Sequence, residues 1–255
     1  MGGERTVEVS PDPLLLALFL VVSLLYSSVG LGGGSSYTAL MAVFGMDYRM
    51  IPTISLTMNV AVTSMAVVNF WRRGHVDFRL ILPFVISSVP MAYVGGAISV
   101  TRETFLWLLL VTLVFVVVRL YFWNGSSFRM RLTERQIRIL SFLLGGVLGF
   151  VAGAVGIGGG IYLVPLMIVG GLASEKGAAA TGACFVWINS LAGLLSRAQR
   201  GAFDAGVVLP LLGTVIVGGF VGSRLGAGVF KPRTVQKAVG AVVILAIIYL
   251  VKDLV

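Results

Sequence analysis

The chain has 255 residues, of which 58% are hydrophobic and only 11% are charged, and its mean hydropathy is +1.01. A soluble domain carries about 25% charged residues, so the composition excludes an ordinary soluble protein and indicates a polytopic membrane protein. The net charge of +9 comes from basic residues that mostly lie at the ends of apolar runs. This placement is typical of contacts with lipid headgroups and predicts no nucleic-acid partner.

The first half of the chain begins with a short polar lead at residues 1–13 and continues as a membrane repeat over 14–123. Its first apolar segment, 14–44, is interrupted by glycines at 30–34. At 1.5 Å per residue this segment is too long for one straight crossing of a hydrocarbon core about 30 Å thick. It is therefore either two tilted pieces or a re-entrant hairpin. Three further helices are expected over 51–71, 80–98 and 104–123.

The second half repeats this plan after a basic linker at 124–136. A membrane repeat is expected over 137–255, and its first apolar segment, 137–170, is interrupted by glycines at 156–160. Three helices then follow over 177–196, 205–226 and 234–252. The fold class predicted is therefore an all-α polytopic membrane protein, built from two homologous four-segment repeats in which the first segment of each is broken at a GGG cluster.

Matching residues support a duplication. An offset of 127 superimposes Arg73-Gly74 on Arg200-Gly201, Pro83 on Pro210 and Val94-Gly95 on Val221-Gly222. The orientation of the two repeats stays open. If each broken segment crosses the membrane, the repeats are parallel. If each is a hairpin that returns, the repeats are inverted, and the positive-inside rule is satisfied in both cases.

The two glycine clusters are the candidate functional site, since consecutive glycines break a helix and a half-helix that restarts there has unpaired N–H groups. Such an N-terminus binds anions without a formal charge, and discontinuous helices in two halves indicate a transporter site. The alternative is that the glycines only permit close helix crossing. The residues expected to bind substrate here are Gly32, Gly33, Gly34, Ser35, Ser36, Gly158, Gly159 and Gly160.

Polar side chains on the helix after each break extend this candidate site. Thr53 and Asn59 lie on the first of these helices, and Thr181 and Asn189 lie on the second. Two interpretations remain open for them, namely substrate binding and hydrogen bonds that join helices. Arg197 and Arg224 lie at segment ends, where they could attract an anion, although such residues more typically extend to lipid headgroups.

Enzymatic and cation-transport functions lack the residues they need. All acidic residues fall in loops, termini or segment ends, whereas a cation pump or an aspartyl protease usually needs an intramembrane carboxylate. The one histidine, His75, lies in a loop, so no membrane-embedded base is available for a serine protease. The one cysteine, Cys184, excludes an internal disulfide and a multi-cysteine metal site. We predict no catalytic residue, no metal and no cofactor.

The chain resembles the sulfite exporter TauE/SafE family of bacterial membrane permeases. The resemblance is carried by the two G-[LI]-G-G-G elements, by the threonine-containing helix starts Pro52-Thr53-Ile54-Ser55 and Ala180-Thr181-Gly182-Ala183, and by Arg-Gly followed by aspartate, as at Asp77 and Asp204. It implies transport of sulfite, sulfoacetate or related organosulfonates. The family's common pattern has Gly-Thr-Ser at those helix starts, and this chain departs from it in both copies.

The function predicted is a secondary transporter of small sulfur oxyanions in the bacterial inner membrane. The alternatives are a carrier for another small solute and a non-transporting membrane scaffold. The expected partners are a small anionic substrate and the lipid bilayer, and a homodimer is a further expectation. Alternating access around a site where the two glycine breaks meet is the expected mechanism.

Overall fold

The computed structural model describes residues 12–254 except 29–30, 123–132, 199–204 and 226–231. The described residues form an all-helical structure with no strand. Its ten helices are α1 (Pro13–Ser28), α2 (Gly34–Val43), α3 (Ile51–Arg72), α4 (Phe78–Ala97), α5 (Arg102–Phe122), α6 (Glu134–Val155), α7 (Gly160–Val169), α8 (Glu175–Ala198), α9 (Ala205–Leu225) and α10 (Pro232–Leu254).

The helices agree closely with the segments predicted from the sequence, and the two broken segments each become a long helix followed by a ten-residue helix. Four helices, α4, α5, α8 and α10, begin two residues earlier than predicted, and the largest difference is at the start of α6. α6 begins at Glu134, inside the predicted linker, because Thr133 caps it: the Thr133 hydroxyl accepts a hydrogen bond from the backbone N–H of Gln136, whose side chain accepts one from the N–H of Thr133. The remainder of that linker and residues 1–11 of the polar lead lie outside the described residues.

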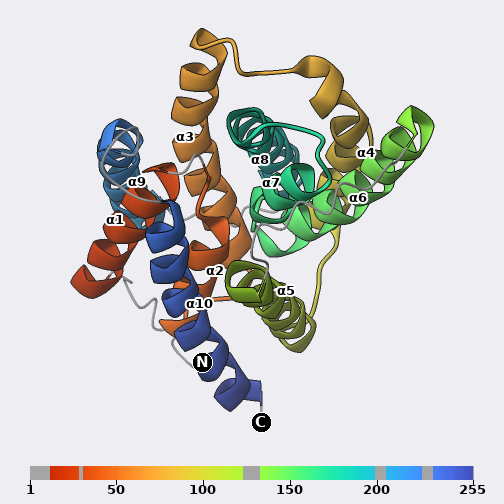
Figure 1. Cartoon of the computed structure of the whole chain (residues 1–255). Helices are drawn as coiled ribbons and strands as arrows, with labels where there is room; N and C mark the ends of the chain where they lie inside the picture. The colour runs from red at the N-terminus through yellow and green to blue at the C-terminus, as the bar shows by residue number, and fades with distance from the viewer. Residues whose placement is uncertain (1–11, 29–30, 123–132, 199–204, 226–231, 255) are drawn as a thin grey trace, which may run out of the picture.

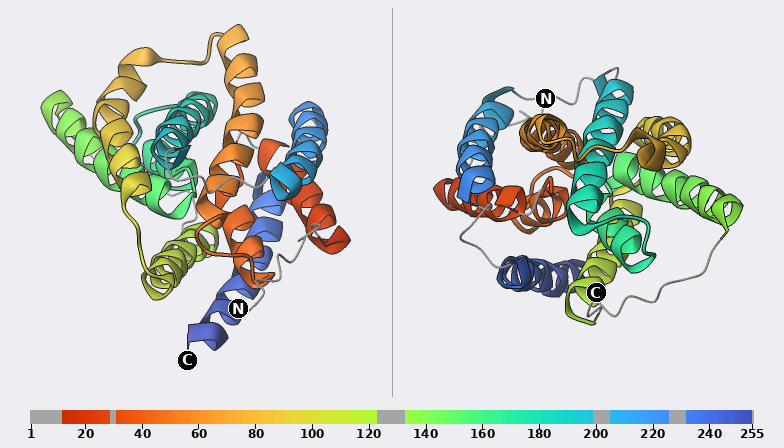
Figure 2. Two further views of the ribbon diagram at one scale, coloured as in Figure 1. Left: turned by 180° about the vertical axis from the view of Figure 1, so that it is seen from behind. Right: turned by 45° about the horizontal axis from the view of Figure 1, so that its top comes forward.

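Five described helices, α3, α4, α6, α8 and α9, are long and apolar enough to cross a membrane by length and composition. α3 and α8 are the most buried of the five and lie at the centre of the bundle. The pair α1 and α9 lies on one flank and the pair α4 and α6 on the other, and α5 and α10 pack together below them (Figures 1 and 2). The central pair is therefore shielded from lipid, where polar groups can be accommodated.

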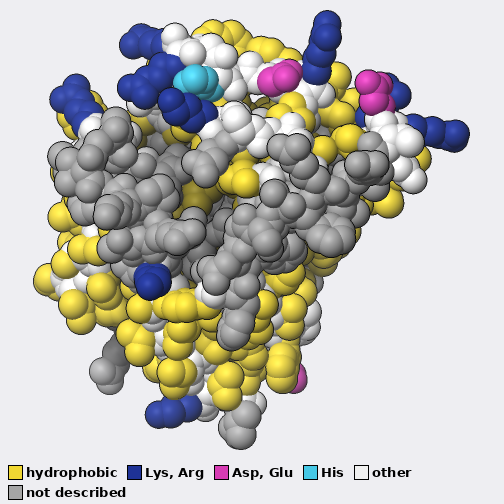
Figure 3. Space-filling model, viewed as in Figure 1, with side chains coloured by type: hydrophobic (Ala, Val, Ile, Leu, Met, Phe, Trp, Pro, Cys, Tyr) yellow, Lys and Arg dark blue, Asp and Glu magenta, His cyan; other side chains and the backbone are white. Residues whose placement is uncertain are grey.

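The flanking helices present apolar side chains outward. Exposed hydrophobic residues include Leu82 and Ile86 on α4, Leu143 and Val147 on α6, and Val217 on α9. In Figure 3 hydrophobic side chains make up most of the described surface below the upper edge, and basic side chains gather along that edge. In a water-soluble protein such a surface would favour association, whereas in a bilayer it contacts lipid tails.

Glycine stripes allow the flanking pairs to pack closely. Gly145, Gly149 and Gly153 on α6 face the backbone of α4, so that a Cβ at Gly149 would collide with the carbonyl of Ser88. On the other flank Gly222 of α9 faces the backbone of α1 at Leu24. These are the small-residue contacts typical of membrane helix pairs.

The first broken segment is a hairpin, because α2 turns back along α1. The rings of Phe19 on α1 and Tyr37 on α2 stack with centroids 4.8 Å apart, although eighteen residues of continuous helix would separate them by about 27 Å. The hydroxyl of Tyr26 lies 2.8 Å from that of Ser35. The second segment also turns back, since a Cβ at Gly159 would lie 3.4 Å from the carbonyl oxygen of Leu148 on α6. Of the two arrangements compatible with the sequence, the structure adopts the hairpin.

The central helices α3 and α8 run in opposite directions. The indole N–H of Trp187 on α8 donates a hydrogen bond to Ser64 on α3 at 2.9 Å. Six residues later on α8, Gly193 packs against Leu56, which precedes Ser64 by eight residues on α3. Residue numbers thus rise on one helix as they fall on the other. The N-terminal end of α3 lies beside the C-terminal end of α8.

Candidate functional site

The first glycine break positions the start of α2. Gly33 is the N-cap residue and has φ +88°, in the left-handed region that L side chains rarely adopt. A Cβ there would also lie 2.8 Å from the ring of Tyr37. Gly32, Gly33 and Gly34 are all buried; Gly30, which opens the motif, lies outside the described residues.

The second break has three glycines in the left-handed region of the backbone dihedrals. Gly156, Gly158 and Gly159 have φ values of +85°, +79° and +74°. Gly156 is the C-cap of α6 and Gly159 is the N-cap of α7, which begins at Gly160. Glycine is required at these positions because a residue with a Cβ atom would strain the backbone in this left-handed conformation.

The two breaks, more than 120 residues apart in sequence, meet beside the N-terminal half of α3. A Cβ at Gly34 would lie 2.6 Å from the carbonyl oxygen of Ile157. The Ser55 hydroxyl donates to the carbonyl oxygens of Gly156 at 2.8 Å and Gly34 at 3.3 Å, and Asn59 Nδ2 donates to Gly156 at 3.3 Å. We call this region, formed by Gly32–Gly34, Gly156–Gly160, Ser55 and Asn59, the glycine junction.

One apolar side chain fills much of the space at the junction. The methyl groups of Val186 on α8 face three glycines, and a Cβ at Gly32 or Gly158 would lie 3.1 or 2.8 Å from Val186 Cγ1. Gly160 faces Val186 Cγ2. The junction is therefore closed in this conformation, with α8 packed against both broken helices.

The other predicted residues lie around the junction in different settings. Ser35 and Ser36 point to Tyr26, whose hydroxyl lies within 3.0 Å of both. Asn189 Nδ2 donates to the Phe185 carbonyl within its own helix. Among the described residues, the oxygens Asn59 Oδ1, Thr53 Oγ1, Thr181 Oγ1 and Asn189 Oδ1 are buried and have no hydrogen-bond partner. Unsatisfied buried polar atoms are unusual in proteins, and four of the predicted site residues carry them.

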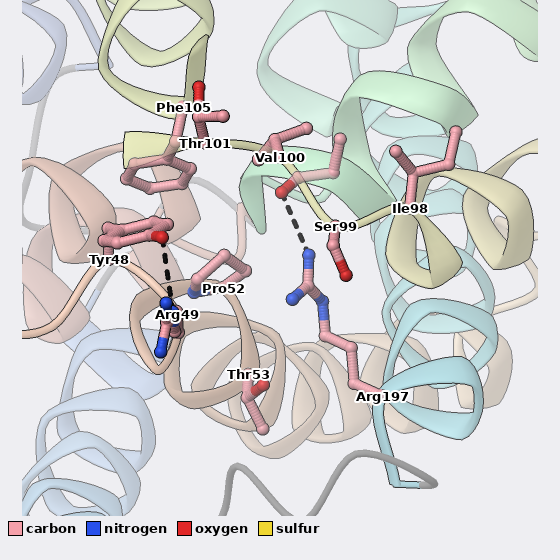
Figure 4. Close-up of a pocket in the computed structure, with 11 residues that line it drawn as sticks. Tyr48, Arg49, Pro52, Thr53, Ile98, Ser99, Val100, Thr101, Phe105 and Arg197 are labelled. Carbon is pink, nitrogen blue, oxygen red and sulfur yellow. Dashed lines mark hydrogen bonds between the residues drawn. The ribbon is translucent and has the colours of Figure 1, made fainter. Parts of the chain in front are cut away.

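A cavity of about 440 Å³ opens next to the junction, at the N-terminal end of α3 (Figure 4). Thr53 is the predicted site residue that it includes. We call this cavity the arginine pocket; it is lined by Tyr48, Arg49, Pro52, Thr53, Ile98, Ser99, Val100, Thr101, Phe105, Ala154 and Arg197. Of the residues that the structure describes in this lining, two are cationic and none is acidic.

Arg197 extends from the end of α8 into the middle of this pocket (Figure 4). Its side chain is only 8% exposed, and Nη2 donates to the carbonyl oxygens of Gly153 at 2.9 Å and Ala154 at 3.0 Å. These are among the last carbonyls of α6, which carry the negative end of the helix dipole. The interpretation that Arg197 extends to lipid headgroups is therefore wrong, because the break in α6 offers it buried acceptors. Arg224 is exposed at the end of α9.

Arg49 supplies the second charge of the pocket, and sequence reasoning did not select it. It lies in the connection between α2 and α3, and its Nε donates to the hydroxyl of Tyr48 at 3.2 Å. This hydrogen bond, followed by the charges of Tyr48 and Asp47, raises the pKa of Arg49 above its usual value. No sequence pattern predicts that Arg49 and Arg197 line the same pocket, because 148 positions separate them in the chain.

The described residues offer no cluster of side chains for a metal ion. The described residues contain no group of three or more His, Cys, Asp or Glu side chains that could hold a metal ion. Cys184 is a buried free cysteine on α8. The donors available at the junction and the pocket are guanidinium groups, hydroxyls, amides and backbone N–H groups, which suit an oxyanion.

The sequence profile of the family described as "Sulfite exporter TauE/SafE" matches residues 15–250. The chain belongs to the TauE/SafE family. Relatives of this TauE/SafE chain include the "Probable membrane transporter protein y4hK" of Sinorhizobium fredii, which is 29% identical over 221 residues covering 84% of this chain and 87% of that protein. The "Probable membrane transporter protein YjnA" of Bacillus subtilis is 25% identical over 91% of this chain and 96% of its own length.

A third relative, "Probable membrane transporter protein MJ0441" of Methanocaldococcus jannaschii, is 24% identical and covers 72% of this chain and 71% of its own length. No solved structure matches the chain. Together with the apolar helices, these findings identify a multi-pass membrane transporter of the TauE/SafE type. The resemblance found in the glycine motifs is thereby confirmed.

Proposed function

We propose that this TauE/SafE protein is a permease that moves a small sulfur oxyanion, such as sulfite or a sulfoacetate-like organosulfonate, across the bacterial inner membrane. The observation that carries the proposal is the arginine pocket, where Arg49 and the buried Arg197 line one cavity beside the glycine junction. Guanidinium groups bind the oxygens of tetrahedral and pyramidal oxyanions through charge-assisted hydrogen bonds. The charged residues that the described part of this lining contains, Arg49 and Arg197, are both cationic.

In this proposal the anion passes from the arginine pocket to the glycine junction. Thr53 belongs to the pocket lining, and Ser55 and Asn59 follow on the same helix at the junction. The backbone at Gly32–Gly34 and Gly158–Gly160 lets an anion approach the N-terminal ends of α2 and α7. Ser35, Ser36, Thr181 and Asn189 supply further hydroxyl and amide groups close to this path.

The buried oxygens without partners support a ligand-binding role. A buried polar atom without a partner costs about 1–3 kcal/mol, and Asn59, Thr53, Thr181 and Asn189 each carry one. Four such groups close to the broken helices are better explained by a polar ligand or its water shell than by helix packing alone.

We further propose that the two halves, 14–123 and 137–255, are inverted repeats that alternate access to this site. The packing of α1 on α9 has a counterpart in the packing of α6 on α4, each through glycines or serines. α3 and α8, which occupy corresponding places in the two halves, run antiparallel. Both features are expected of two units related by an axis in the membrane plane.

The proposal is tested by ligand-dependent thermal stability of the detergent-purified protein. The ligands are sulfite, thiosulfate, sulfate, sulfoacetate and taurine, with an uncharged sugar as control. A ligand present at about 100 times its dissociation constant adds roughly 2.7 kcal/mol to the stability of the folded state. We expect stabilisation by sulfite or a sulfonate that Arg197→Gln removes.

Two other results would favour the alternatives. Stabilisation by an uncharged compound, unaffected by Arg197→Gln, would favour a carrier for another solute. No stabilisation at saturating concentrations, together with no uptake or efflux in liposomes, would favour a scaffold.

A further inference from the structure

A second cavity, of about 540 Å³, lies at the opposite end of α3 from the arginine pocket. It is lined by Ser64, Met65, Val68, Asn69, Arg73, Phe220, Ser223 and Arg224. We call it the far pocket. Among the described residues its lining again contains two arginines and no acidic residue, and it brings together the C-terminal ends of α3 and α9.

The two pockets are arranged along one helix. Thr53 belongs to the arginine pocket and Ser64 to the far pocket, and the eleven helical steps from one to the other correspond to about 16 Å. Ser55, Asn59 and Thr63 are buried polar residues on the same stretch. α3 therefore has a basic cavity near each end, and the glycine junction contacts it between the two.

The positive charge of the far pocket is held in place. The guanidinium of Arg224 lies 3.9 Å above the ring of Phe220, a cation–π contact that fixes its position. Arg73 follows the last residue of α3. Asn69 and Ser223 add an amide and a hydroxyl, so the lining contains the donors that an oxyanion needs.

Between the far pocket and the junction the path is closed by a contact between the two central helices. Trp187 on α8 donates its indole N–H to Ser64 at 2.9 Å. Val186, the neighbouring residue, fills the junction against Gly32, Gly158 and Gly160. A movement of α8 relative to α3 would open both barriers together.

Charge indicates which side of the membrane each pocket faces. The end of the bundle where α3 ends carries many described basic residues (Figure 3), namely Arg72, Arg73, Arg79, Arg135, Arg138, Lys176 and Arg224. The end where α3 begins carries Arg49, Arg102, Arg197 and Lys252. The positive-inside rule places the far pocket on the cytoplasmic side.

We infer that the far pocket is a second anion-binding vestibule, cytoplasmic in location, and that the Ser64–Trp187 contact closes it from the glycine junction. Its ligand is a small oxyanion of the class that we propose for the arginine pocket, so this inference rests on the proposed function for the identity of the ligand. Anion binding in the far pocket is inferred from its own lining residues, and the following experiment tests it separately.

The experiment measures cysteine modification in the full-length protein carrying Cys184→Ala, which removes the one native cysteine. Ser64→Cys and Asn69→Cys place thiols in the far pocket, and Thr53→Cys places one in the arginine pocket. Two impermeant methanethiosulfonate reagents of similar size are compared, one carrying a sulfonate and one carrying a trimethylammonium group. Inside-out and right-side-out vesicles report the side from which each thiol is reached.

We expect the anionic reagent to modify Asn69→Cys and Ser64→Cys about tenfold faster than the cationic reagent, from the cytoplasmic side only. Arg73→Ala with Arg224→Ala should remove this preference. Ser174→Cys, an exposed position just before α8 that is followed in the sequence by one acidic and one basic residue, is the control and should show no preference for the anion. Equal rates for the two reagents in the far pocket, or access from the opposite side, would overturn the inference.

A lipid phosphate has the same chemistry as a free oxyanion, so the measurement is repeated in nanodiscs of phosphatidylcholine with and without phosphatidylglycerol. Anion preference that persists with phosphatidylglycerol supports a vestibule for a soluble ion. Preference that disappears with phosphatidylglycerol identifies a headgroup site and overturns the inference. Because neither outcome depends on sulfite binding, a failure of the proposed function remains distinguishable from a failure of the vestibule.

Discussion

The hydroxyl of Ser55 donates a hydrogen bond to the carbonyl oxygen of Gly156, 101 residues further along the chain, at 2.8 Å. Ser55 is on α3 and Gly156 ends α6, so one side chain of the first half holds the helix break of the second. The same hydroxyl lies 3.3 Å from the carbonyl oxygen of Gly34 at the first break. The geometry of both breaks therefore depends on this position.

Ser55→Ala should destabilise the protein and weaken transport together. The substitution leaves the Gly156 carbonyl with only the longer bond from Asn59, and loss of a buried hydrogen bond costs about 1–3 kcal/mol. Thermal unfolding in detergent and flux in liposomes measure the two effects. Thr57→Ala on the same helix, whose hydroxyl bonds only to the Thr53 carbonyl of its own helix, is the matched control and should change little. Equal effects of the two variants would contradict a special role for Ser55.

Arg197→Gln should reduce anion affinity by tenfold or more, since a hydrogen bond to a charged group contributes about 1.5–3 kcal/mol. Arg197→Lys keeps the charge but not the planar group that reaches two carbonyls, and we expect an intermediate loss. Isothermal titration with sulfite or the best ligand of the stability screen measures the affinity. Arg79→Gln removes an exposed arginine at the start of α4 and should leave the affinity unchanged.

Gly34→Ala should abolish transport, because the new Cβ would lie 2.6 Å from the carbonyl oxygen of Ile157. Overpacking of this kind typically costs about 1–3 kcal/mol, so folded protein should still be recovered. Gly213→Ala is the control. Nothing lies within 4 Å of a Cβ at that helical position, and alanine there should stabilise α9 by about 0.5–1 kcal/mol. Normal flux in Gly34→Ala would show that the close contact of the two breaks is not needed for transport.

Gly149→Ala should lower the yield of folded protein, whereas Gly146→Ala should not. A Cβ at Gly149 would collide with the Ser88 backbone on α4, but one at Gly146 would meet only side chains at 3.8 Å. The two glycines are three residues apart on α6, so helix propensity affects them equally and the difference reports interhelical packing. Size-exclusion chromatography of the two variants from equal culture volumes provides the comparison.

Much of the helical framework could be predicted from the sequence because apolar length and glycine breaks are local signals. The fold-back of α2 could not, since a crossing segment and a hairpin satisfy the charge rule equally; the Phe19–Tyr37 contact decides it. The depth of Asn59 in an apolar segment predicts an interior position, and the structure places it at the junction. The duplication and the substrate-binding roles stay predictions.

The arginine pocket was only partly predictable, for two physical reasons. A segment-end arginine is normally solvated by headgroups, and Arg197 turns inward only because the break in α6 exposes the Gly153 and Ala154 carbonyls beside it. Arg49 becomes part of the pocket through the tertiary packing of α3 against α8. Neither effect leaves a mark in the local sequence pattern.

The position of Val186 has an implication for how substrate range can diverge among related transporters. Its methyl groups occupy the space faced by Gly32, Gly158 and Gly160; Gly32 and Gly158 also face the side chain of Asn59. Asn59 in addition donates a hydrogen bond to the Gly156 carbonyl, whereas Val186 only fills space, so residue 186 is the natural place for evolution to adjust the size of the cargo. Selection for growth on bulkier sulfonates should therefore return alanine or glycine at this codon before it alters the glycine clusters.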